Sequence, residues 1–110
     1  MMVPAVYRGC DVKIDFSSVL LDLKDKPIEI NVDGEKVPMT LALAASEALL
    51  IMDPREQDGA LKSQYFKLTL RVVNGGEVEL EPKDAELIKK KIGARWSPLI
   101  VGRAFELLNG

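Results

Sequence analysis

The sequence predicts a small α+β domain spanning residues 1–110, with an N-terminal β-hairpin or meander followed by three to four helices and a short strand near residues 77–81. Apolar and polar residues alternate near the N-terminus, as is typical of half-buried strands, whereas apolar residues at helical spacing dominate the later segments. The length supports a single core, because two cores would leave each half near the lower size limit for independent folding.

The first predicted strand covers residues 12–16, where apolar and polar side chains alternate. Ser17 and Ser18 interrupt this strand. The apolar run at 19–23 is either a short helix capped by one of these serines or a bent continuation of the strand. Residues 24–27 end in a proline and are predicted to form a turn.

A β-hairpin is the clearest local signal in the chain. Alternating segments at 28–32 and 35–37 flank Asp33 and Gly34. An Asp-Gly pair tolerates positive φ at both central positions, which favours a tight type I′ turn. Pro38 cannot donate a backbone hydrogen bond, so the second strand is predicted to be short or to lie at an edge.

A buried helix is predicted over residues 41–52, which are rich in Ala and Leu. Thr40 is suited to cap its first turn, and Asp53 before Pro54 is expected to end it. The apolar positions cover more than one stripe, which indicates burial on several sides. The polar segment 53–59 lacks the acidic spacing of a calcium loop and is interpreted as a solvated connection.

Residues 60–73 carry two competing patterns. Leu61, Tyr65, Leu68 and Val72 recur at helical spacing, whereas residues 66–72 alternate strictly, as they would in a strand. The local pattern alone slightly favours a strand in the second half of this segment. Both interpretations remain open at this point.

The C-terminal part is predicted to hold a strand at 77–80 and helices at 82–92 and 99–108. Three glutamates, at 77, 79 and 81, are expected to face solvent. Pro82 suits the start of the first helix and Gly93 is expected just beyond its end. Gly102 is costly inside a helix, so a close approach by another helix or by a second copy of the chain is expected there.

The composition argues against several functional classes. The chain has no His and one Cys, which removes most zinc sites, any His-based triad and an intramolecular disulfide. We therefore expect no enzyme activity, no metal and no cofactor. A net charge of -2 provides no overall field to attract nucleic acid or an anionic membrane.

The compartment predicted from the sequence is a reducing cytoplasm. Residues 1–8 lack the basic start and long apolar stretch of a secretory signal, and no segment approaches the length of a membrane span. A single cysteine, Cys10, suits a compartment in which thiols stay reduced.

One cluster could hold an anionic ligand. Arg95, Trp96 and Arg103 combine basic groups and the only Trp with the start of the last helix. Cations and free backbone N–H groups attract phosphate or carboxylate, and an indole offers a stacking surface. The simpler interpretation is that the preceding lysines decorate a helix end and Trp96 fills the core between two helices.

Residues 28–110 resemble a set of small phage and prophage proteins of unassigned role. The resemblance rests on Thr40-Leu41 opening a helix, on Gly59 in a polar loop, and on three later segments: 78–80, 84–89 and 98–108. In that set the segment corresponding to 60–73 is usually predicted to be a helix. The β-branched and apolar content at 67–73 departs from the pattern, but the resemblance still favours a helix here. The resemblance supplies no catalytic residues.

These observations together predict a non-enzymatic, phage-encoded accessory protein that binds a host or phage protein in the host cytoplasm. Inhibition of a host or anti-phage defence factor is one form this activity could take. The mechanism would be steric occlusion through an apolar patch with a charged rim.

Two alternatives remain open. One is a virion or assembly component, such as a tail or head–tail subunit or chaperone, whose apolar face forms a homodimer or a higher oligomer. The other is a module that binds a small anionic ligand or nucleotide around Arg95, Trp96 and Arg103.

Overall fold

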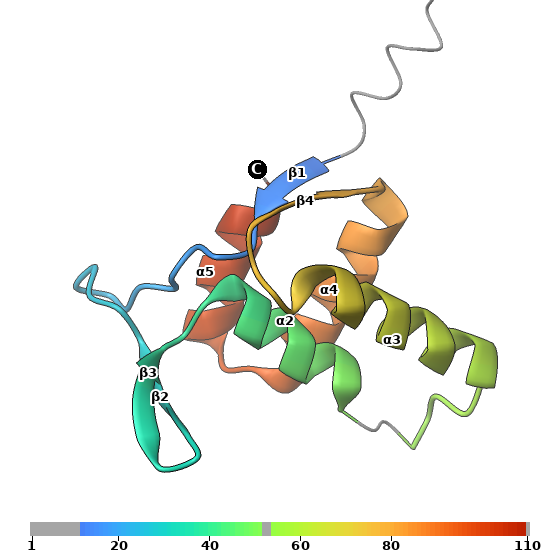
Figure 1. Ribbon diagram of the computed structural model, residues 1–110, viewed down its shortest axis with the longest axis horizontal. Helices are drawn as coiled ribbons and strands as arrows, with labels where there is room; N and C mark the ends of the chain where they lie inside the picture. The colour runs from blue at the N-terminus through green and yellow to red at the C-terminus, as the bar shows by residue number, and fades with distance from the viewer. Residues whose placement is uncertain (1–11, 52–53, 110) are drawn as a thin grey trace, which may run out of the picture.

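The computed structural model describes residues 12–51 and 54–109 and confirms the α+β class (Figure 1). Met1, Cys10, Met52 and Asp53, on which some of the predictions fall, lie outside the described residues. Within the described part, the elements in chain order are β1 (Val12–Asp15), β2 (Glu29–Val32), β3 (Glu35–Pro38), α2 (Leu41–Leu50), α3 (Gly59–Val72), β4 (Glu77–Leu80), α4 (Pro82–Arg95) and α5 (Pro98–Leu108).

The strands form two small antiparallel sheets. β2 and β3 make the predicted hairpin, whereas β1 pairs with β4, so that Val12 lies opposite Leu80 and Asp15 opposite Glu77. The meander that would have joined β1 to the hairpin therefore does not form. β1 and β4 belong to opposite halves of the sequence. Their pairing therefore brings together the two ends of the segment that contains α2 and α3.

The segment after β1 is a bent extended stretch and not a helix. Val19 forms an isolated bridge with Thr40, and Leu21 forms one with Pro27. The N–H of Leu20 donates to the carbonyl of Met39 at 2.8 Å. Leu20 and Met39 are both buried, so this stretch contributes to the core as well as connecting the two sheets.

The hairpin turn has the predicted type I′ backbone. Asp33 has a φ of 52° and Gly34 a φ of 85°, which are the two positive values that this turn requires. β3 ends at Pro38 and pairs with β2 alone, in agreement with the expected short edge strand.

The helix α2 is the centre of the domain and contacts both α3 and α4. Seven of its ten residues are buried, as its Ala- and Leu-rich composition predicts. Ala and Leu favour helix formation, and the small Ala side chains allow neighbouring helices to approach closely. Thr40 caps the helix as predicted, because its Oγ1 accepts a hydrogen bond from the N–H of Leu43 at 3.2 Å.

Replacing Thr40 with Ala is expected to lower the free energy of unfolding by about 1 kcal/mol, because one N–H of the first turn loses its acceptor. Urea unfolding followed by circular dichroism measures this change. Thr40→Ser provides the matched control and should stay close to the wild type, since the serine hydroxyl can accept the same bond. An equal loss in both variants would contradict the capping role.

Residues 59–72 form the helix α3, which settles the competition between the two patterns. Asp58 caps this helix by accepting a hydrogen bond from the N–H of Ala60 at 2.9 Å. Tyr65, Leu68 and Val72, three of the four residues at helical spacing, are buried against the core. Burial of this stripe therefore outweighs the strand-like alternation of residues 66–72.

The two C-terminal helices differ from the prediction at both glycines. Gly93 lies inside α4, which continues to Arg95 and ends with Trp96 as its cap residue. A Cβ built on Gly93 would lie 3.9 Å from the ring of Phe105 in α5, whereas one built on Gly102 would have nothing within 4 Å. The predicted close approach at Gly102 is therefore not found within the described chain.

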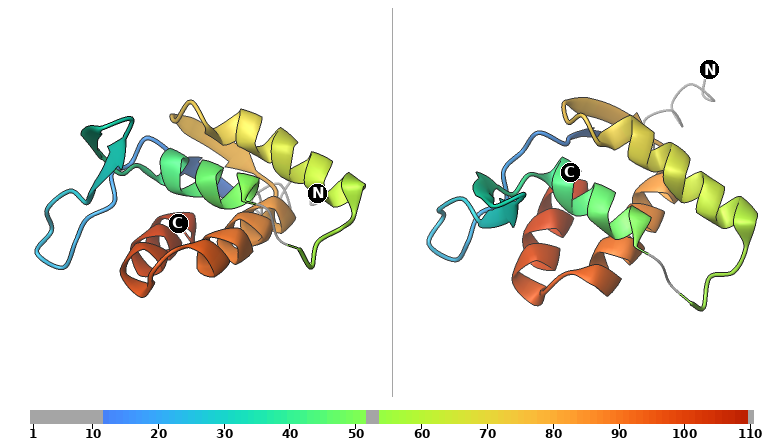
Figure 2. Two further views of the ribbon diagram at one scale, coloured as in Figure 1. Left: turned by 90° about the horizontal axis from the view of Figure 1, so that it is seen from below. Right: turned by 60° about the horizontal axis from the view of Figure 1, so that its bottom comes forward.

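The four helices and the β1–β4 pair enclose one main core, and the hairpin projects from one side of it (Figures 1 and 2). α2 and α3 run antiparallel, with α4 and α5 across the other side of α2 (Figure 2). This arrangement leaves the outer side of α3 uncovered. Among the described residues, no helix is both long enough and apolar enough to span a membrane.

Candidate functional site

The uncovered side of α3 and the end of α2 carry a group of exposed apolar side chains. Phe66, Leu70 and Val73 are 47–57% exposed and follow one another at helical spacing. Leu50 and Ile51 are 60% and 44% exposed and lie at the end of α2. We refer to these five residues as the apolar face. Apolar side chains grouped in this way on a soluble domain mark an interaction surface more often than scattered ones do.

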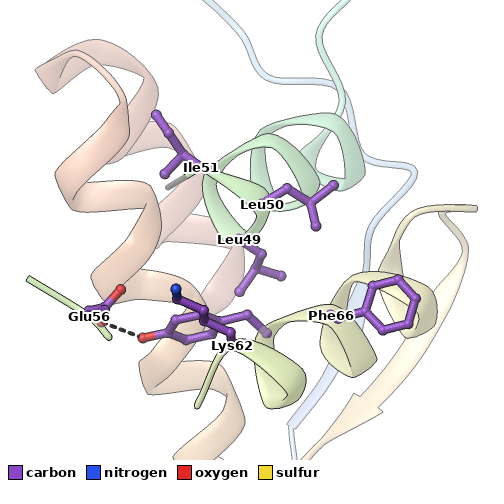
Figure 3. Close-up of a pocket in the computed structure, with 7 residues that line it drawn as sticks. Leu49, Leu50, Ile51, Glu56, Lys62 and Phe66 are labelled. Carbon is purple, nitrogen blue, oxygen red and sulfur yellow. Dashed lines mark hydrogen bonds between the residues drawn. The ribbon is translucent and has the colours of Figure 1, made fainter. Parts of the chain in front are cut away.

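A pocket of about 200 Å³ lies at one end of the apolar face (Figure 3). Leu49, Leu50 and Ile51 form one wall, and residues of α3 form the other. In Figure 3 the ammonium group of Lys62 lies on the side of the pocket toward the end of α2, and Phe66 points outward beside it. The pocket is therefore apolar with a cation at its edge.

Glu56 lines the same pocket and is held by three groups. Its carboxylate accepts hydrogen bonds from the Tyr65 hydroxyl at 2.6 Å and from the Lys91 ammonium at 2.8 Å, and Lys90 lies 3.7 Å away. The Lys91 hydrogen bond, followed by that of Tyr65, holds the pKa of Glu56 below its ordinary value, although partial burial opposes the shift. The negative charge of this carboxylate is thus already balanced by lysines of the same chain.

Lys91 is buried despite its charge. Only 4% of its side chain is exposed, and its ammonium lies 4.7 Å from the centre of the Tyr65 ring. Most of the loop before α3 is exposed, as predicted, but Glu56 reaches inward to satisfy this lysine. The expectation that all three lysines of α4 decorate a helix end is therefore wrong for Lys91.

A second hollow lies at the other end of the apolar face. Val73 lines it together with Leu43 and Ser46 of α2 and with residues of the β2–β3 hairpin. The hydroxyl of Ser46 is buried and has no hydrogen-bond partner among the residues that the structure describes. The apolar face thus has a hollow at each end.

The predicted ligand residues Arg95, Trp96 and Arg103 are engaged in contacts within the domain. Arg95 stacks on the Trp96 ring, 4.1 Å from its centre, and lies 3.7 Å from Glu47. The indole N–H of Trp96 donates to the carbonyl of Ala44 at 3.0 Å. Trp96 packs against both hydrophobic clusters, which agrees with the interpretation that it fills the core.

Arg103 ties α5 to the loop that follows β1. Its guanidinium donates to the carbonyls of Leu21 and Asp22 at 3.0 and 2.9 Å and contacts Asp25 and Glu106 at 3.3 Å. The structure therefore directs Arg95 toward α2 and Arg103 toward a different segment. A ligand binding there would have to compete with these partners, and the anionic-ligand site stays a prediction.

The other acidic groups of the described chain were compared with the prediction and with the arrangement of a metal site. Glu77, Glu79 and Glu81 are exposed, as predicted. Across the described ranges, no group of three or more His, Cys, Asp or Glu side chains is arranged to hold a metal ion. The cluster of Glu56, Tyr65 and Lys91 was not identified from the sequence, because nothing in the local patterns connects a loop residue with the middle of α4.

The apolar face was also not predicted from the sequence, although the apolar residues that form it are visible in the pattern of α3. Phe66 and Leu70 are the residues that made this segment resemble a strand, and in the helix they form a second apolar stripe on the solvent side. A helix that is apolar on two sides would have been a clue to an interaction surface. Comparisons of the chain with protein-family models, with curated proteins and with solved structures found no match.

Proposed function

We propose that this protein is a non-enzymatic binding protein that recognises another protein through the apolar face. The single observation that supports the proposal is the exposure of Leu50, Ile51, Phe66, Leu70 and Val73 on one side of the α2–α3 pair. Burying such a surface against a partner removes apolar area from water, which is the main favourable term in most protein associations.

The surroundings of this face also suit protein binding. Lys62 and Lys67 of α3 are exposed and form no ion pair with any described residue, so charged groups flank the apolar centre. An apolar centre with a polar rim is the usual anatomy of a protein interface. Binding would act by steric occlusion, and the resemblance to phage proteins extends the proposal to a host or phage partner in the cytoplasm.

Site-specific photo-crosslinking in living bacterial cells tests the proposal. A photoreactive phenylalanine analogue replaces Phe66 on the apolar face or, as the control, Leu23, which is 85% exposed in a distant loop. We expect a discrete crosslinked species from position 66 alone. Adding Leu70→Ser should weaken it by about tenfold or more, as expected when a central apolar contact is removed.

Two outcomes would contradict the proposal. Equal, diffuse crosslinking from both positions would mean that the apolar face has no preferred partner. Crosslinking of position 66 to a second copy alone would favour the assembly alternative, in which this surface builds an oligomer of the chain.

A further inference from the structure

We infer that the partner segment is an amphipathic helix that places an acidic side chain beside Lys62 and apolar side chains along the apolar face. This inference rests on the proposed function and names the chemistry of the partner. It follows from the size of the pocket, from the order of side chains along α3 and from the charges around the pocket.

The size of the pocket favours a side chain over a free small molecule. Its volume of about 200 Å³ is below the range of roughly 300–1,000 Å³ typical of small-molecule sites. A single large apolar side chain can fill such a space against the wall formed by Leu49, Leu50 and Ile51. An anchor of this kind is the usual centre of a helix-in-groove interface.

The order of residues along α3 suits a helical partner. Lys62, Phe66, Leu70 and Val73 lie on one stripe of the helix, with the cation at one end and apolar groups after it. At 1.5 Å per residue this stripe is about 16 Å long, or roughly three helical turns. A partner helix with apolar residues at i, i+4 and i+7 presents its anchors at the same intervals.

The charges around the pocket favour an acidic partner. Lys62 lines the pocket and has no carboxylate partner among the described residues, whereas Glu56 is already bound by Lys91 and Tyr65 and lies close to Lys90. Lys91 and Lys90 therefore already lie 2.8 and 3.7 Å from Glu56, and Lys62 adds a further positive charge at the same pocket. A partner carboxylate beside Lys62 would reduce this excess of positive charge, whereas a basic partner would add to it.

A selection from a yeast-displayed library of helical peptides tests the inference. The library has randomised positions on one face and is screened against the wild-type protein and against Lys62→Glu. We expect wild-type binders to carry apolar residues at i, i+4 and i+7 with Asp or Glu at the end near Lys62. The Lys62→Glu protein should instead select Lys or Arg at that position.

A matched control separates this contact from general charge effects. Lys67→Glu makes the same charge change on α3, but Lys67 does not line the pocket, so the acidic preference should persist. Changing the acidic residue of a selected peptide to its amide should weaken binding to the wild type by up to about fivefold, the size expected of an exposed ion pair. Amide NMR shifts caused by the peptide should lie at residues 49–51 and 62–73.

The possible failures are distinguishable. Binders without an acidic preference, or with one that Lys62→Glu leaves unchanged, overturn the acidic contact. A library that yields no binder on this surface overturns the helical partner, while discrete crosslinking from position 66 would still support the proposed function. Analytical ultracentrifugation could also show a dimer that Phe66→Ser dissociates. This result would assign the apolar face to a second copy of the chain and overturn the inference.

Discussion

Replacing Glu56 with Gln is expected to lower the free energy of unfolding by about 3 kcal/mol, because it leaves the buried Lys91 ammonium without a compensating charge. Lys91 has 4% of its side chain exposed and Glu56 has 14%. Water therefore cannot replace the lost partner at Lys91. Breaking a buried ion pair in this way costs more than the pair contributes by itself, since an unpaired charge remains in a poorly solvated place.

A double-mutant cycle measured by urea unfolding tests this expectation. Lys91→Met should cost only about 1 kcal/mol, because Glu56 is partly exposed and keeps Tyr65 and Lys90 nearby. The double variant Glu56→Gln, Lys91→Met should recover most of the loss, since no charge is then buried. Losses that simply add in the double variant would show that the two side chains do not interact.

The pH dependence gives an independent check on the same pair. The folded-state pKa of Glu56 lies below its ordinary value of 4.5, chiefly because of the Lys91 hydrogen bond. A depressed carboxylate pKa stabilises the fold fully above the unfolded value, and this stability is lost as the pH falls through the folded value. The stability gap between the wild type and Glu56→Gln should therefore be constant near neutrality and shrink below about pH 4.5.

Two phenylalanines should respond in opposite ways to the same substitution. Phe16→Ala is expected to cost about 3–5 kcal/mol of unfolding free energy, because Phe16 is completely buried and its removal leaves a cavity. Phe66→Ala should change stability by no more than about 0.5 kcal/mol, since 55% of Phe66 is exposed. Partner crosslinking through the apolar face should instead be weakened more by Phe66→Ala than by Phe16→Ala.

Thermal and urea unfolding of both variants, with crosslinking from Leu70, would measure this contrast. Phe66→Ala should weaken the crosslink while leaving the unfolding midpoint nearly unchanged. A large loss of stability in Phe66→Ala would mean that this side chain supports the fold, and it would remove the main reason for assigning the apolar face to binding.

Sequence patterns predicted those parts of the fold whose causes are local. The type I′ turn follows from two adjacent residues, Asp33 and Gly34, whose backbone preferences need no tertiary partner. The Thr40 cap and the α2 helix likewise depend on residues a few positions apart. The end of α4 was misplaced because Gly93 is a common stop signal, whereas α4 continues through it to Arg95.

The candidate site was beyond local patterns, because its parts are far apart in the chain. Glu56 and Lys91 are separated by 35 residues, and no spacing rule joins a loop glutamate to a lysine in the middle of a helix. The charge run of α4 predicted three solvated lysines, and only the tertiary contacts with Glu56 and Tyr65 decide that Lys91 is the buried one. Of the predicted trio, Arg95 and Trp96 stack on each other, whereas Arg103 is bound to the segment after β1.

By itself the sequence determined the fold class, the hairpin, the capped central helix and the absence of histidine chemistry, since these depend on composition and on neighbouring residues. The tertiary structure decided between the two competing local patterns in favour of a helix at residues 59–72, and it alone decided that β1 pairs with β4 and that Phe66 and Leu70 remain in solvent. The physical reason is that a segment with two apolar patterns adopts the one whose stripe its distant neighbours can bury. The other pattern is left exposed, and here it forms the surface that we assign to a partner.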